Sequence, residues 1–115
     1  RGGLATILAE MVSAGQFGVE FEEVLLPVRE QVAGLCELYG FNPLYLANEG
    51  KVLMVVEAGS ADKALEVMQQ FDTGRDARII GSVTDRRPGK VLMKSVTGGT
   101  RVVDRLAGEQ LPRIC

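Results

Sequence analysis

The stretch "FGVEFE" (17–22) alternates apolar side chains with glycine and carboxylates. Because successive side chains of a strand point to opposite faces of a sheet, this alternation predicts a half-buried β-strand with its apolar residues on the core side. Apolar residues at helical spacing over 4–12 precede it, and Gly15 is a suitable stop for a helix. The chain therefore begins with a helix followed by a strand.

Downstream of this strand, helical and strand patterns alternate. The predicted elements are a helix over 27–40, a buried strand over 51–57, a helix over 60–71, and strands over 77–84, 90–96 and 100–106. Pro27 and Gly40 are suited to open and close the first of these helices, and Ser60 to cap the second. The segments "DRRPG" (85–89) and "TGG" (97–99) are hairpin-like. This order predicts an α+β domain with a mixed, mostly antiparallel sheet packed with helices.

Size and charge restrict the class of protein. A length of 115 residues suits one domain, and a net charge of −2 argues against nucleic-acid binding, which needs a clustered basic surface.

The longest apolar run, 52–56, is too short to span a bilayer, and no secretory signal is visible, so we expect a cytoplasmic protein and no membrane partner. Because the chain starts with Arg1 and not with Met, we expect either a piece of a longer protein or a processed product. We expect a domain over 1–107 and a flexible tail over 108–115 that carries the terminal cysteine.

Histidine is absent, and cysteine occurs twice. The lack of histidine excludes Ser-His-Asp and Cys-His catalysis within this chain and most metal sites that need imidazole, so we expect no metal site. Two cysteines are too few for a disulfide framework. Cys36 falls on the apolar face of the helix predicted over 27–40, which indicates a buried core thiol.

Cys115 ends the sequence "AGEQLPRIC". An exposed terminal thiol can act as a nucleophile or a carrier, and an extended seven-residue arm gives it a reach of about 23 Å. Arg113 favours the thiolate, whereas the terminal carboxylate disfavours it. The residues alone leave two interpretations open: a functional thiol, or an accident of where the chain stops.

Glu49 lies in "NEGK", a turn that presents its carboxylate ahead of the strand predicted over 51–57. A carboxylate is normally ionised at neutral pH and can serve as a general base. The same residues also fit a plain turn in which Gly50 has positive φ.

The opening residues Arg1, Gly2 and Gly3 precede a helix. Backbone amides at the start of a helix can receive a phosphate group, so these three residues are a weak candidate for cofactor binding.

Three stretches together carry a family resemblance: "RGGLATILAEM" (1–11), "LPVREQVAGLCELYGFNPLYLANEGK" (26–51) and "GGTRVVDRLAGEQLPRIC" (98–115). They resemble the C-terminal domain of the HypE family of hydrogenase expression/formation proteins, which are carbamoyl dehydratases. The resemblance covers nearly the whole chain, and its most specific feature is the "PRIC" ending. "RGGLA" is also similar to aminoimidazole ribonucleotide (AIR) synthetase and selenophosphate synthetase, which do not share that ending.

The resemblance implies an AIR synthase-related C-terminal domain and a specific reaction. It implies that Cys115 receives a carbamoyl group from HypF, and that ATP-dependent dehydration turns this group into a cyanide. Glu49 matches the position of the family's carboxylate. The cyanide passes to the HypC–HypD complex for the iron centre of [NiFe]-hydrogenase. ATP is bound mainly by an N-terminal domain absent here, so this chain alone is expected to be inactive.

The resemblance also implies a full-length homodimer. Two alternatives remain beside the dehydratase. One is a non-catalytic binding or scaffold module, and the other is the C-terminal domain of another AIR synthase or selenophosphate synthetase-like ATP enzyme.

Overall fold

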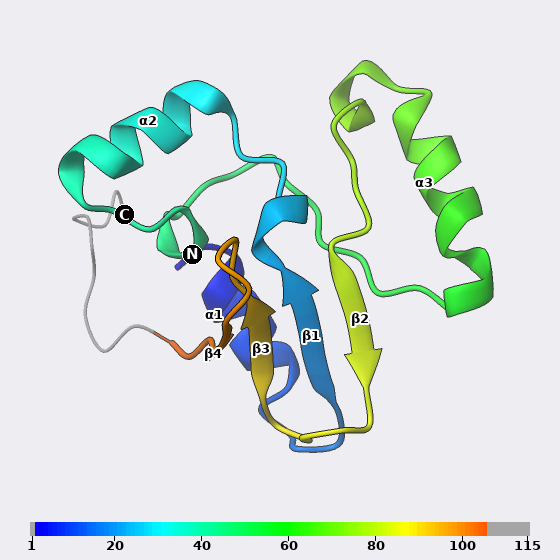
Figure 1. Ribbon diagram of the computed structural model, residues 1–115. Coiled ribbons are helices and arrows are strands. Elements are labelled where there is room, and N and C mark those ends of the chain that lie inside the picture. Colours follow the sequence, from blue (N-terminus) through cyan, green and yellow to red (C-terminus); the bar gives the residue numbers. More distant parts are fainter. Residues whose placement is uncertain (1, 106–115) are drawn as a thin grey trace.

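A four-stranded sheet forms the centre of the computed structural model, which describes residues 2–105 (Figure 1). The helices are α1 (Gly3–Met11), α2 (Glu30–Tyr39) and α3 (Ala61–Gln69), and the strands are β1 (Gly18–Glu22), β2 (Gly81–Thr84), β3 (Val91–Lys94) and β4 (Thr100–Val102). The strands are shorter than predicted. The predictions for the tail over 108–115, for Cys115 and for Arg1 lie outside the described residues.

The strand order is β2-β1-β3-β4, and the sheet is mixed. β1 pairs antiparallel with β2 and parallel with β3, while β3 pairs antiparallel with β4. Val19 of β1 lies opposite Val83 on one side and Val91 on the other. The prediction of a mixed, mostly antiparallel sheet in an α+β domain is therefore confirmed.

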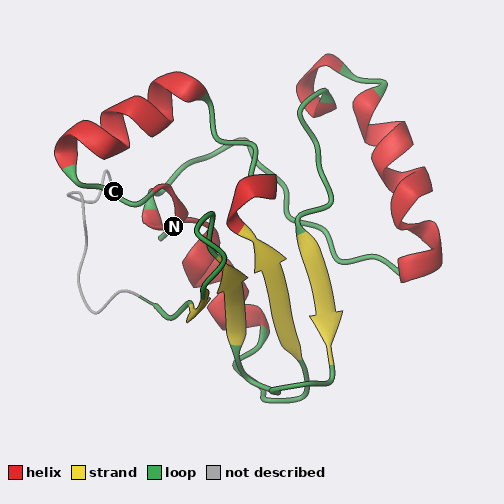
Figure 2. Ribbon diagram, viewed as in Figure 1, coloured by secondary structure: helices red, strands yellow, loops and turns green. Residues whose placement is uncertain are grey.

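Helix α1 covers one face of this sheet, and the core lies between the two layers (Figure 2). Buried side chains come from α1, from β1 and β3, and from three positions outside these elements, Val12, Leu44 and Val103: Ala5, Leu8, Val12, Val19, Phe21, Leu44, Val91, Met93 and Val103. The inward positions of β1 are those that its alternation predicts, with Glu20 and Glu22 less buried between and after them. Among residues 2–105, no helix lies on the opposite face of the sheet (Figures 1 and 2).

The strand predicted over 51–57 is wrong. This segment contains no strand, and Val52, Met54 and Val55 are each more than half exposed. Its β-branched, apolar residues have high strand propensity, but a strand also needs a neighbour that accepts its backbone hydrogen bonds. Within the described residues, no backbone hydrogen bond is donated or accepted by residues 51–56.

The hairpin predicted over 85–89 is also wrong, because β1 lies between the two strands that this turn connects. The turn instead packs against the start of β1, where the Gly89 N–H donates to the Phe17 carbonyl at 2.8 Å. A side chain at Gly18 would overlap the backbone of this turn, so glycine is required there. The hairpin-like connection over 97–99 is confirmed, since it joins the antiparallel pair β3 and β4.

Helix α2 begins at Glu30 and not at Pro27, and ends at Gly40 with φ +70°. Cys36 is the one buried residue of α2, at 4% exposed, which confirms the predicted core thiol. The rest of its predicted apolar face is exposed, including Leu35.

Helix α3 has no buried residue and no side-chain cap from Ser60. Four residues of its predicted inner face, Ala61, Ala64, Leu65 and Met68, are half-buried, whereas the other residues of the helix are exposed. The fifth predicted residue, Phe71, follows the helix and is 64% exposed. Over residues 2–105, no helix is both long and apolar enough to cross a membrane.

Candidate functional site

The N-terminus of α1 packs against a short 3₁₀ turn, Pro43–Tyr45. Gly2 and Gly3 both have positive φ, +75° and +70°, and Thr6 Oγ1 donates a hydrogen bond to the Gly2 carbonyl at 2.9 Å. A Cβ atom on Gly3 would overlap backbone atoms of residues 44–46. These glycines therefore have a definite structural role: they allow the start of the helix to touch the turn.

The segment after this turn carries Glu49. The Leu44 N–H donates to Asn42 Oδ1 at 3.0 Å, and Asn48 Nδ2 donates to the Leu46 carbonyl at 2.9 Å. Gly50 has φ +71°, which confirms the predicted turn geometry. Local side-chain hydrogen bonds of this kind are what make asparagine common in turns.

The Glu49 side chain is exposed and, among residues 2–105, forms no hydrogen bond or ion pair. The Leu46 carbonyl lies against Gly3, and Glu49 follows Leu46 by three residues, so its Cα is within about 11 Å of that contact. The structure thus places two segments that the sequence analysis singled out, the glycines at the start of α1 and the segment that carries Glu49, near each other. A free carboxylate near a helix N-terminus can accept a proton beside a place suited to anions.

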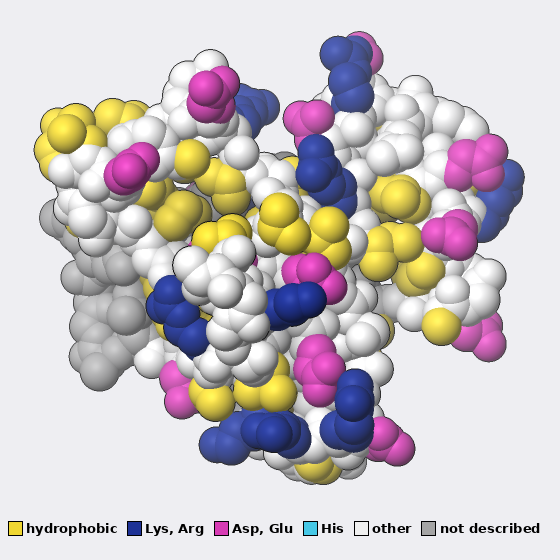
Figure 3. Space-filling model, viewed as in Figure 1, with side chains coloured by type: hydrophobic (Ala, Val, Ile, Leu, Met, Phe, Trp, Pro, Cys, Tyr) yellow, Lys and Arg dark blue, Asp and Glu magenta, His cyan; other side chains and the backbone are white. Residues whose placement is uncertain are grey.

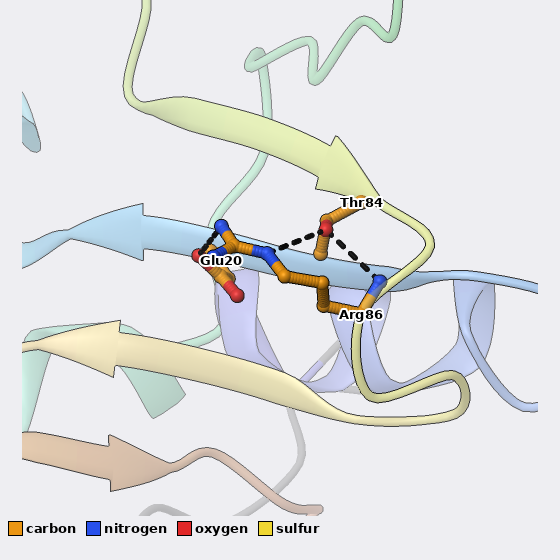
Figure 4. A network of polar contacts seen from close by, with 3 residues as sticks. All are labelled: Glu20, Thr84 and Arg86. Atoms are coloured by element: carbon orange, nitrogen blue, oxygen red, sulfur yellow. Dashed lines mark hydrogen bonds and ion pairs between the residues drawn. The ribbon is translucent and has the colours of Figure 1, made fainter.

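The open face of the sheet carries a second, polar group that the sequence does not reveal. Arg86 Nη2 lies 3.2 Å from Glu20 Oε2, and the Arg86 N–H and Nε both donate to Thr84 Oγ1 (Figure 4). Glu20 and Arg86 line a shallow hollow of about 740 Å³ together with Lys94 and Glu22, where Figure 3 shows charges of both signs. Pairing residue 20 with residue 86 requires the strand register, which no local pattern provides. The pair is exposed, so we assign it to the surface of the fold.

No group of three or more His, Cys, Asp or Glu side chains suited to a metal occurs in the part of the chain that the structure describes.

Comparison with known proteins connects this geometry to a family. The profile described as "AIR synthase related protein, C-terminal domain" matches residues 1–94. This chain belongs to that family. The α+β fold with three helices and a four-stranded mixed sheet is the fold that the resemblance implies.

Members of this AIR synthase-related family with curated names are similar over the whole chain. The chain is 49% identical over 115 residues to the carbamoyl dehydratase HypE of Cupriavidus necator and 45% identical to that of Rhodobacter capsulatus. It covers 33% and 34% of these two proteins, so the chain spans about a third of the length of the relatives it matches.

Solved structures support the same similarity to HypE. The hydrogenase maturation protein HypE in complex with ATP superposes with a TM-score of 0.89 at 42% identity, over 100% of this chain and 36% of the other. A HypE–HypF complex superposes with a TM-score of 0.85 at 44% identity, over 92% of this chain and 34% of the other. The resemblance to HypE drawn from three sequence stretches is therefore confirmed along the chain.

Proposed function

We propose that this chain is the C-terminal part of an ATP-dependent carbamoyl dehydratase, which converts an S-carbamoyl group on Cys115 into S-cyanide for the iron centre of [NiFe]-hydrogenase. The observation that carries the proposal is the 45–49% identity, over all 115 residues, to proteins named carbamoyl dehydratase HypE. Because the chain spans about a third of those relatives, the activity belongs to the whole protein, and the chain alone is inactive.

The first step loads the thiol. The Cys115 thiolate attacks the carbonyl carbon of an activated carbamoyl group that HypF presents, the activating group departs, and a C–S bond forms. The similarity to a HypE solved in complex with HypF supports this choice of donor.

The second step removes the elements of water. An amide oxygen is a poor leaving group, and ATP supplies the phosphoryl group that converts it into phosphate. The carbamoyl nitrogen loses one proton to solvent as its oxygen takes the γ-phosphoryl group and ADP departs. The second proton passes to the Glu49 carboxylate as the C–O bond breaks, leaving a carbon–nitrogen triple bond on sulfur.

Two features of the described residues suit this role. Glu49 is exposed and makes no competing hydrogen bond or ion pair within residues 2–105, so its oxygens are available to a substrate. Helix α1, whose start packs against the preceding turn Pro43–Tyr45, has no acidic residue in its first turn, so the helix terminus keeps its preference for an anion. We assign Arg1, Gly2 and Gly3 a minor part in holding phosphate, and most of the ATP site to the N-terminal remainder of the protein.

The product leaves as cyanide bound to sulfur, and the HypC–HypD complex is the proposed acceptor. The proposal places the reaction in the cytoplasm, where thiols stay reduced, and in a full-length homodimer.

Glu49→Gln in the full-length protein tests the base. The variant keeps carbamoylation by HypF and loses dehydration by about 10²–10⁴ in rate, because a positioned base contributes about that factor. The measurement is the mass of the C-terminal peptide over time, with HypF, carbamoyl phosphate and ATP present. Glu37→Gln is the matched control, since Glu37 is an exposed carboxylate on α2. Equal dehydration rates in the two variants would reduce Glu49 to a turn residue.

Cys115→Ala separates a carrier from a scaffold. The variant loses both the carbamoyl and the cyano adduct, because the other thiol, Cys36, is buried. A cyano group detected on the Ala variant, or no adduct on the natural protein, rejects the dehydratase proposal in favour of a binding module.

A further inference from the structure

The residue that follows β4 is held on the side of the sheet that α1 covers. The Val103 N–H donates to the Val91 carbonyl at 2.8 Å. The Val103 side chain is 4% exposed and belongs to the same core cluster as Ala5 and Leu8 of α1. The position of the chain directly after β4 is therefore fixed by both the sheet and the helix.

Arg105, two residues further on, contacts α1 itself. Its Nη2 atom lies 3.8 Å from Glu10 Oε1, and the two side chains are 56% and 59% exposed. An exposed ion pair of this kind adds little to the free energy of unfolding, and salt weakens it. Because the pair joins the last described residue to the last turn of α1, its main effect is on the direction of the chain at that point.

The sequence that follows Arg105 is the terminal segment, residues 106–115, which ends in Cys115. Ten fully extended residues span up to about 33 Å. Helix α1 is about 14 Å long, and Gly3 at its start lies against residues 44–46, which precede Glu49. A segment that starts beside the last turn of α1 is therefore long enough to bring Cys115 back along the helix toward the Glu49 turn.

We propose that Arg105 is a positioning residue for the carrier thiol of Cys115. Its ion pair with Glu10 fixes the start of the terminal segment on the α1 side of the sheet, and so brings Cys115 to the Glu49 turn more often. The inference rests on the proposed function, in which Cys115 carries the group that Glu49 deprotonates. Tethering acts through the effective concentration of the tethered group, so loss of the fixed point slows dehydration. Loading is unaffected, because HypF is a separate protein that approaches the thiol from solution.

Arg105→Gln in the full-length protein, with HypF, carbamoyl phosphate and ATP present, tests this inference. The masses of the carbamoylated and cyanated C-terminal peptides over time give the rates of loading and of dehydration separately. Dehydration slows by about two- to fivefold, the factor that corresponds to the energy of an exposed ion pair, while the rate of loading and the midpoint of thermal unfolding are unchanged. The exchanged pair, Glu10→Arg together with Arg105→Glu, recovers most of the natural dehydration rate, because opposite charges again face each other.

Arg86→Gln is the matched control, because Arg86 forms a similar exposed ion pair, with Glu20 at 3.2 Å, that does not involve the residues leading to Cys115. Dehydration in this variant equals that of the natural protein. Equal dehydration rates in the Arg105 and Arg86 variants overturn the inference, as do equal slowing of loading and dehydration or an exchanged pair that recovers nothing. Absence of any adduct on the natural protein rejects the proposed function and this inference together, whereas normal adducts with equal rates in both variants overturn the inference alone.

Discussion

Gly3→Ala is the most direct test of the contact between the start of α1 and residues 44–46, which precede Glu49. Gly3 has φ +70° and is buried, and a Cβ atom there would overlap the backbone of residues 44–46. Gly15 has nearly the same φ, +72°, but a Cβ atom there would meet nothing within 4 Å. Both glycines therefore have a left-handed backbone conformation, but only at Gly3 would an added Cβ atom overlap other backbone atoms.

The expected magnitudes follow from this comparison. A left-handed conformation costs a non-glycine residue about 1–2 kcal/mol, so Gly15→Ala lowers the free energy of unfolding by about that amount. Gly3→Ala has the same cost and adds about 1–3 kcal/mol for inserting a methyl group into a packed contact with backbone, which cannot rotate away. The total, about 2–5 kcal/mol, is a large part of the stability of a typical domain.

Urea denaturation followed by circular dichroism measures both variants against the natural chain. Shifted midpoints with unchanged slopes would show that the free energy of unfolding has changed while the surface exposed on unfolding has not. If Gly3→Ala and Gly15→Ala shift the midpoint equally, then the start of α1 does not pack closely against the turn Pro43–Tyr45. The proposed contact between this helix and the segment that leads to Glu49 would then be rejected.

Three further substitutions test the core and the surface. Cys36→Ser lowers the free energy of unfolding by about 1–3 kcal/mol because it buries a hydroxyl group without an assured partner, and native Cys36 reacts slowly with a thiol reagent; rapid labelling would contradict its burial. Phe21→Ala costs about 3–5 kcal/mol, since Phe21 is 3% exposed, whereas Phe71→Ala, at a residue 64% exposed, costs much less; thermal unfolding of the pair checks this. Arg86→Ala changes stability by less than about 1 kcal/mol despite its ion pair with Glu20, and a larger loss that persists in high salt would show that the pair is not surface-like.

The parts of the fold that the sequence predicts correctly are those with a local cause. The alternation over 17–22 identifies β1 and its inner face, because burial of one face follows directly from the period of a strand. The inner face of α3 follows from helical spacing in the same way, and Gly40 ends α2 because glycine adopts positive φ easily.

The errors have a non-local cause. The segment 51–57 has the composition of a strand, but pairing depends on a neighbour, and residues 2–105 provide none. The turn over 85–89 has the composition of a hairpin, yet β1, distant in sequence, separates the strands that it joins. The composition of a segment indicates its local conformational preference, whereas both errors concern which strand lies beside the segment in the fold.

The candidate site likewise has features with a local cause and features with a non-local cause. The turn that carries Glu49 and the positive φ of Gly50 follow from local residue types. The contact between Gly3 and residues 44–46, which precede this turn, joins residues about forty positions apart, and no sequence motif predicts it. The roles of Glu49 and Cys115 came from the family resemblance and remain predictions.

The central position of β1 has a consequence for synthesis of the chain. Both neighbours of β1 follow it by about sixty residues or more, as the pairing of Val19 with Val83 and Val91 shows. A ribosome therefore releases β1 with two unpaired edges long before either partner exists, while α1 can shelter only one of its faces. Such a delay favours slow closure of the sheet and contact with chaperones or with other nascent chains. Codon changes that alter the pace of translation between β1 and β2 are expected to alter the yield of soluble protein more than the same changes placed after β4.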